Sequence, residues 1–219
     1  MPAGRTLGAV WVRCAVLLLT LAACGSSSAA SHLLPASAGP GCGPAGVRTL
    51  AASRLARVYA TSAEVYGCSE RTRRTTRLGQ SATCVGSPKV TAVTVAGESA
   101  AYGTEICGVD TGSSSLVVRR LSDGRVLRQF PAISGPIRPE SFVSVASVVA
   151  KPGGAAAWIA LAESILTHSS SIEVLAAGSS GTGSRVLDRG RGINPGSLAL
   201  RGSRLTWSDH GRTRSASLR

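Results

Sequence analysis

The 219-residue chain contains few of the side chains on which catalysis and base recognition depend. Aromatic residues make up 4 % of it, and it has three histidines and 11 acidic residues. The arginine cluster at 71–77 contains no aromatic side chain that could stack on a base. The net charge of +13 therefore indicates a solvated, arginine-coated surface, and nucleic acid is disfavoured as a partner.

Recognisable catalytic motifs are also missing. Ser208, Asp209 and His210 are the residue types of a hydrolase triad, but immediate neighbours on a strand or turn point in different directions. The sequence has no G-x-S-x-G nucleophile elbow. The glycine-rich stretch 178–184 precedes no helix signal, so it is not a phosphate loop. We therefore predict no catalytic residue, no cofactor and no metal site.

An apolar stretch near the start indicates a leader. Residues 14–23, CAVLLLTLAA, follow Arg5 and Arg13 and are too few to span a bilayer as a helix, but they suit a signal sequence. The stretch ends in Leu21-Ala22-Ala23-Cys24, which resembles the lipobox of bacterial lipoproteins. The resemblance implies that residues 1–23 are a cleaved signal peptide and that acyl chains such as palmitate on Cys24 anchor the protein to the membrane. Ordinary secretory cleavage, with Cys24 incidental, is the alternative.

The segment after Cys24 has the composition of a linker. Residues 24–46 are dominated by Gly, Ser, Ala and Pro, and they offer too little apolar surface to offset the cost of ordering. We therefore expect a flexible tether over 24–46 and a folded domain over 47–219.

Cysteine usage supports export. With Cys14 in the leader and Cys24 at the lipid site, the remaining four are Cys42, Cys68, Cys84 and Cys107. An even number in an exported chain predicts two disulfides, and the spacings match no zinc pattern. Four cysteines allow three pairings. We favour Cys84–Cys107, because both would flank one predicted hairpin, which leaves Cys42–Cys68.

The folded part shows β-type patterning. From residue 47, short alternating runs are separated by Gly, Ser, Asp and Pro, and no stretch sustains the period of a helix. Residues 153–168 are rich enough in alanine to form a helix, but their Gly-Gly start and β-branched neighbours favour strands. The sequence predicts an all-β domain.

A repeat underlies this pattern. One aromatic recurs in each of four segments, and nine residues before it lies an aliphatic residue, with turn-forming residues between them. A constant offset predicts that the two positions of each pair face each other across a hairpin. The pairs are Leu50 and Tyr59, Val93 and Tyr102, Val149 and Trp158, and Leu198 and Trp207.

Later runs complete most of the repeats. Closing strands are expected at Val126-Leu127 and Val186-Leu187, whereas the fourth repeat stops at 212–219 without one. The layout, with the turn Ser122-Asp123-Gly124, resembles the degenerate β-propeller repeats of secreted bacterial proteins. The resemblance implies about four blade-like, four-stranded antiparallel units, with a β-sandwich as the alternative. Either a segment near the N-terminus closes the ring or an open arc exposes a strand edge.

Two classes of function fit these features. The first is a non-enzymatic binding scaffold, lipid-anchored to the outer face of the bacterial cell membrane, that presents loops to a protein or an anionic cell-wall ligand. The second is an extracytoplasmic hydrolase or lyase with acidic residues at the blade mouths. A glycosidase would need two facing carboxylates, which the sequence alone does not place.

Overall fold

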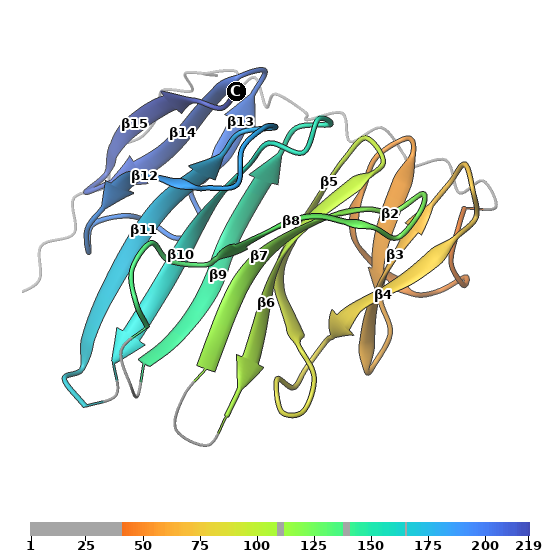
Figure 1. Ribbon diagram of the computed structural model, residues 1–219, viewed down its shortest axis with the longest axis horizontal. Coiled ribbons are helices and arrows are strands. Elements are labelled where there is room, and N and C mark those ends of the chain that lie inside the picture. Colours follow the sequence, from red (N-terminus) through yellow and green to blue (C-terminus); the bar gives the residue numbers. More distant parts are fainter. Residues whose placement is uncertain (1–40, 109–111, 138–140, 165) are drawn as a thin grey trace, which may run out of the picture. The chain divides into compact units, whose positions relative to one another are not determined.

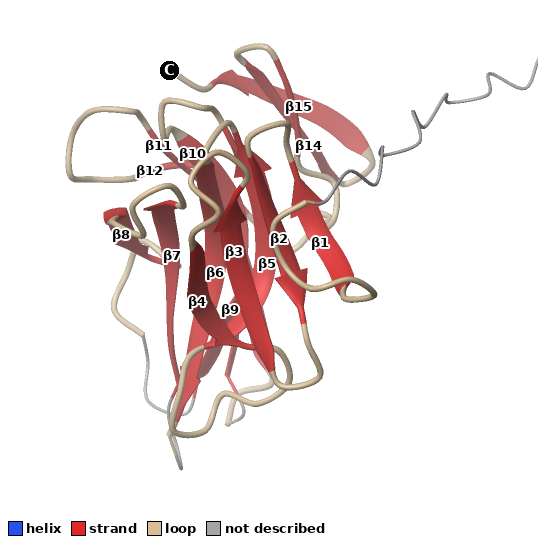
Figure 2. Cartoon of the chain, turned by 90° about the vertical axis from the view of Figure 1, so that its right-hand side faces the viewer, coloured by secondary structure: helices blue, strands red, loops and turns tan. Residues whose placement is uncertain are grey.

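The computed structural model describes residues 41–108, 112–137, 141–164 and 166–219, and their regular secondary structure consists of strands (Figure 2). The described residues include no helix with the length and hydropathy needed to span a bilayer. The strands are β1 (Arg48–Ala52), β2 (Ala56–Ala60), β3 (Glu64–Ser69), β4 (Thr75–Gln80), β5 (Lys89–Ala96), β6 (Ser99–Cys107), β7 (Gly112–Arg120), β8 (Val126–Pro131), β9 (Ser141–Ala150), β10 (Ala156–Ser164), β11 (Ser169–Ala177), β12 (Arg185–Arg189), β13 (Ala199–Arg201), β14 (Arg204–Asp209) and β15 (Arg212–Ser217).

The strands pair with their chain neighbours and form four antiparallel meanders (Figure 1). We call β1–β4, β5–β8, β9–β12 and β13–β15 the first, second, third and fourth meander. The first two share one sheet through a single parallel pair, Gln80 with Lys89. The prediction of an all-β domain is therefore confirmed.

Most of the predicted local elements are confirmed. The stretch around Trp158 is the strand β10 and not a helix. The expected closing strands are β8 and β12, and the fourth meander has three strands in the described part of the chain. Each of the four predicted first hairpins is present, joining β1 to β2, β5 to β6, β9 to β10 and β13 to β14.

The predicted pairing at an offset of nine holds in the second meander, where Val93 faces Tyr102. It is wrong in the third, where Trp158 faces Val148 and Val149 lies on the other face of the sheet. The cause is the length of the loop between the two strands. Two residues join β5 to β6, whereas the longer loop 151–155 joins β9 to β10. When the loop has an odd number of residues, the residues that face each other are an even number of positions apart, so they cannot be nine apart.

The pairing also departs from the prediction in the two outer meanders. Tyr59 faces Thr49, because Leu50 lies at an irregularity in the β1–β2 ladder. In the fourth meander the register is the predicted one, with Ala199 facing Thr206, but Leu198 precedes the first residue of β13 and lies just outside the ladder. Bulges and strand ends are decided by local backbone geometry, which a count of residues does not reveal.

The core lies between successive meanders, and one repeat aromatic is buried in each interface. Tyr102 packs between the first and second meanders, Trp158 between the second and third, and Trp207 between the third and fourth. Their neighbours are mainly alanine, valine and leucine. Each meander thus covers the apolar face of the next, because none can bury both of its faces alone.

The first repeat aromatic, Tyr59, has no preceding meander and is covered by the chain segment 41–47, which we call the N-terminal cap. Cys42 forms a disulfide with Cys68 on β3, and this pair packs with Tyr59 as a separate buried cluster. The cap includes residues that composition assigns to the tether. It serves as a terminal unit of the kind that repeat proteins need.

The opposite end of the series has a polar face. On β14, Leu205 and Trp207 point into the core. The alternate positions on β14 and β15 point the other way, and they are the polar residues Arg204, Thr206, Ser208, Thr213, Ser215 and Ser217. With a cap at one end and polar residues at the other, the described strands form no closed propeller, and a description as a sandwich-type all-β fold fits equally well.

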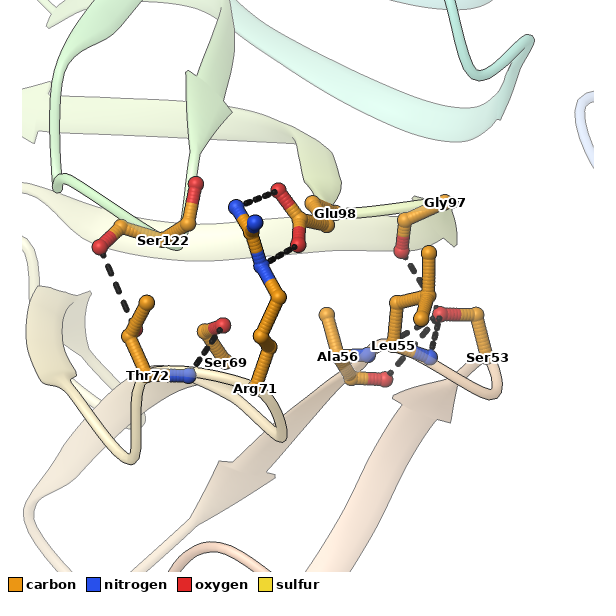
Figure 3. Close-up of polar contacts among 9 residues, drawn as sticks. All are labelled: Ser53, Leu55, Ala56, Ser69, Arg71, Thr72, Gly97, Glu98 and Ser122. Carbon is orange, nitrogen blue, oxygen red and sulfur yellow. Dashed lines mark hydrogen bonds and ion pairs between the residues drawn. The ribbon is translucent and has the colours of Figure 1, made fainter.

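Polar contacts join the turns of neighbouring meanders (Figure 3). The hydroxyl of Ser53 donates to the carbonyl of Gly97 at 2.7 Å, and Arg71 pairs with Glu98 at 2.8 Å. Further along the series, the ammonium of Lys151 donates to the hydroxyl of Ser203 at 3.0 Å. These contacts fix the spacing between meanders at their turn ends.

Candidate functional site

The four cysteines in the described part of the chain form two disulfides. Cys42 is bonded to Cys68 and Cys84 to Cys107, the pairing that the sequence favours. The one candidate cluster of metal ligands in the described part consists of Cys84, Glu105 and Cys107. Two of its sulfur atoms form the disulfide and cannot act as thiolate ligands. Disulfides persist in oxidising compartments, which agrees with an extracytoplasmic location.

The residues of the possible triad are not arranged for nucleophilic catalysis. The imidazole of His210 is 2.8 Å from the carboxylate of Asp209, which also accepts from Arg214 at 3.4 Å. The hydrogen bond from His210 and the nearby Arg214 lower the pKa of Asp209. Ser208 precedes Asp209 on β14 and therefore points to the opposite face of the sheet.

The other carboxylates are spread over the meanders, mostly as partners of arginine. Glu64 pairs with Arg77, and Asp123 pairs with Arg120. Asp110 and Glu140, like Cys24 and His32, lie outside the described residues. Such separate ion pairs are typical of structural surface contacts.

A hollow of about 580 Å³ opens between the strands of the third meander and the segment 133–137 that follows β8. It continues the core around Trp158 toward the ends of β9, β10 and β11. We call it the serine groove. Its lining consists of Ile133, Gly135, Pro136, Ile137, Ser141, Val143, Ala162, Ser164, Ser169, Ser170, Ser171, Glu173, Arg189, Gly190 and Arg191.

The groove exists because the inward-facing positions change from apolar residues to serine along the sheet. Ala160 lies opposite Glu173, Ala162 opposite Ser171, and Ser164 opposite Ser169. On the other side of β10, Ser141 lies opposite Ser164. Along the sheet, hydroxyl groups therefore replace methyl groups at facing positions of three strands, and they add polar groups to a mainly apolar hollow.

One buried carboxylate holds the rim of the groove. Glu173 is 8 % exposed and pairs with Arg189 across the β11–β12 ladder at 2.8 Å. It also accepts from the backbone N–H of Ser134 at 2.9 Å and from the Ser134 hydroxyl at 3.3 Å. The Trp158 indole fixes the same segment by donating to the carbonyl of Ala132 at 2.7 Å. Three polar contacts thus hold Glu173 in place, and through them it positions the rim.

Guanidinium groups lie at the mouth of the groove. Arg191 is exposed, and its Nε donates to the carbonyl of Ser170 at 3.3 Å, which leaves the two terminal nitrogens directed to solvent or a ligand. Hydroxyls both donate and accept, and a guanidinium binds a carboxylate or phosphate through two parallel bonds. The volume lies in the range of small-molecule sites. The groove therefore suits an anionic ligand that carries hydroxyl groups.

A smaller hollow, of about 460 Å³, lies where β1, β5 and β9 approach one another. Arg48, Lys89 and Glu105 line it, and the buried hydroxyl of Thr91 has no hydrogen-bond partner there. It lacks a buried ion pair like that of Glu173 and Arg189, so we regard the serine groove as the better-organised site.

Sequence reasoning missed the serine groove. The run Ser169-Ser170-Ser171 is visible in the sequence, but it is read most simply as a loop. The signal lies in the register of three strands, which is known only after folding. No family model matches this chain, and a search of curated proteins finds no relative, so the site is interpreted from its geometry.

Proposed function

We propose that the chain is an exported lipoprotein, anchored through Cys24 to the outer face of the cell membrane, that binds an anionic, hydroxyl-rich saccharide without transforming it. The saccharide class comprises uronic acids and phosphorylated sugars, which are chemical units of anionic wall polymers. The serine groove, with arginine at its mouth and its carboxylate already engaged, is the observation that carries the proposal.

A propeller-like arrangement of the meanders supports this proposal. First strands lie next to each other, β1 beside β5 and β5 beside β9, as blades do around an axis. In such an arrangement the hollows between sheets are fixed by the packing of whole meanders. A rigid, preformed groove is suited to binding because little ordering is required when the ligand enters.

Electrostatics also supports an anionic ligand. The chain carries +13 net charge, and the carboxylate of Glu173 within the groove is neutralised by Arg189. Arg191 then contributes uncompensated positive charge at the mouth. Charge of one sign lining a hollow attracts a ligand of the opposite sign and speeds its association.

The proposal is tested by titrating the protein with glucuronate, glucose 6-phosphate and glucose while recording amide NMR shifts. We expect both anions to shift the amides of residues 133–137 and 169–173, and glucose to bind at least about tenfold more weakly, which corresponds to one charge-assisted pair. Arg191→Gln should weaken the anions and leave glucose unchanged.

Arg201→Gln is the matched control, because it removes the same charge from an exposed position on β13. It should leave the affinities within a factor of two. Equal binding of glucose and the two anions, or shifts confined to other surfaces, would rule out the proposed ligand class.

A further inference from the structure

Within the described part of the chain, the fourth meander has an unpaired strand edge at the place where the other three carry a closing strand. In the first three, the third strand pairs with β4, β8 or β12. The corresponding third strand of the fourth meander is β15, which pairs with β14 and, among the described strands, with no other. The repeat itself thus defines the place that an additional strand would take.

Hairpin geometry identifies which backbone groups face this edge. His210 and Gly211 both have positive φ, 49° and 75°, and form a two-residue turn between Asp209 and Arg212. The closing pair of such a turn is hydrogen-bonded, and hydrogen-bonded and non-hydrogen-bonded pairs alternate along an antiparallel ladder. The N–H and C=O groups of Thr213, Ser215 and Ser217 therefore point away from β14.

The outward carbonyl of Ser217 already accepts a hydrogen bond from a side chain in place of a neighbouring strand. The guanidinium of Arg185 donates to the carbonyl of Ser217 at 2.8 Å. Beside this contact lies a groove of about 600 Å³, lined partly by Arg185, Ala216, Leu218 and Arg219. Arg185 thus makes the contact that a backbone N–H of an added strand would make.

The β15 edge lacks the register shifts and the proline that the other outer strands carry, although it does carry the charged residues Arg212 and Arg214. The ladders of β4, β8 and β12 each contain a register shift, and β8 ends at Pro131. Bulges and prolines of this kind limit the pairing of an edge with further strands, and β4 accordingly forms only a single pair with β5. The β14–β15 ladder runs without a shift from Arg204–Ser217 to Asp209–Arg212, and β15 contains no proline.

Charge determines the class of occupant. Arg185, Arg212, Arg214 and Arg219 surround the edge, against the carboxylates of Asp188 and Asp209. Pairing of two copies through β15 would bring Arg212 and Arg214 of both chains onto one short ladder, and like charges on neighbouring strands are destabilising. We infer that β15 binds an extended acidic segment of a partner protein, which adds to the fourth meander as its closing strand.

The test supplies such a strand at high effective concentration. The full chain is extended after Arg219 by a short Gly/Ser linker and the sequence EVLDE, which is the β12 sequence RVLDR with both arginines replaced by glutamate. We expect hydrogen exchange of the Thr213 and Ser215 amides to slow by about tenfold or more relative to the unextended chain. An extension carrying RVLDR itself should give less protection, because it adds to the positive charge.

Ser215→Pro removes the outward N–H without touching the β14 ladder, and it should abolish the protection of Thr213 in the EVLDE chain. Ser215→Ala, which keeps the N–H, should retain it. Unchanged exchange in the EVLDE chain, or equal protection by RVLDR, overturns the inference. So does a dimer of the unextended chain that Ser215→Pro dissociates, because a second copy would then be the occupant. None of these outcomes depends on saccharide binding.

Discussion

Glu64 illustrates how single residues stabilise the first meander. It accepts a short hydrogen bond from the Tyr66 hydroxyl and pairs with Arg77 at 2.6 Å. Tyr66 in turn stacks on Tyr59, with ring centroids 5.6 Å apart. The hydrogen bond from Tyr66, followed by that from Arg77, lowers the pKa of Glu64 below its usual 4.5, and the same hydrogen bond raises the pKa of Tyr66.

A lowered carboxyl pKa makes stability depend on pH in one direction. The contribution of Glu64 is complete above pH 4.5 and is lost as the pH falls through its lower pKa in the folded state. Glu64→Gln should therefore be less stable than the wild type at pH 7, and the difference should disappear in strong acid. Urea unfolding at a series of pH values measures this. Glu163→Gln, at an exposed position on β10, is the matched control. A pH-independent difference for Glu64→Gln would contradict the prediction.

At the scale of elements, the N-terminal cap is the least repetitive part of the fold. It depends on a close approach of backbone to ring: a Cβ on Gly43 would lie 2.7 Å from Cε1 of Tyr59. Gly43 also has a φ of 98°, which disfavours any other residue. The cap thus needs glycine at this position for two separate reasons.

Gly46 allows the two reasons to be separated. Its φ is 78°, but a Cβ there would meet nothing within 4 Å. Gly46→Ala should cost about 1–2 kcal/mol for the backbone alone, whereas Gly43→Ala should cost about 1–3 kcal/mol more for the steric clash. Denaturant unfolding of the two variants gives the difference directly. Equal losses would mean that the cap does not press on Tyr59.

The elements also show which features the sequence reveals. Alternation and glycine turns predict the strands and the hairpins, because both are local. The offset between Val149 and Trp158 misleads because it depends on the odd number of residues in the loop before β10. The serine groove is less predictable still, since its hydroxyls come from three strands and become neighbours only through their register.

For the whole molecule, the first and the last of the four meanders differ in what covers them. The first meander is covered by the disulfide-bonded cap, whereas the last presents polar side chains and the β15 edge. A one-dimensional array is stabilised through its nearest-neighbour interfaces, so its ends can differ without weakening the middle. The serine groove lies away from both ends, between the third meander and the segment 133–137 that follows β8.

The proposed anchor is a property of the whole chain, because it decides on which side of the membrane the groove and the edge are presented. A stable hold needs more than one acyl chain, which the lipid on a lipobox cysteine provides. Metabolic labelling with a radioactive fatty acid should therefore mark the wild type and Cys14→Ala, whose cysteine lies in the predicted leader, but not Cys24→Ala. The unlabelled variant should also leave the membrane fraction. Equal labelling of Cys24→Ala would remove the lipoprotein assignment while leaving the disulfide-bonded fold, which does not involve Cys24, as it stands.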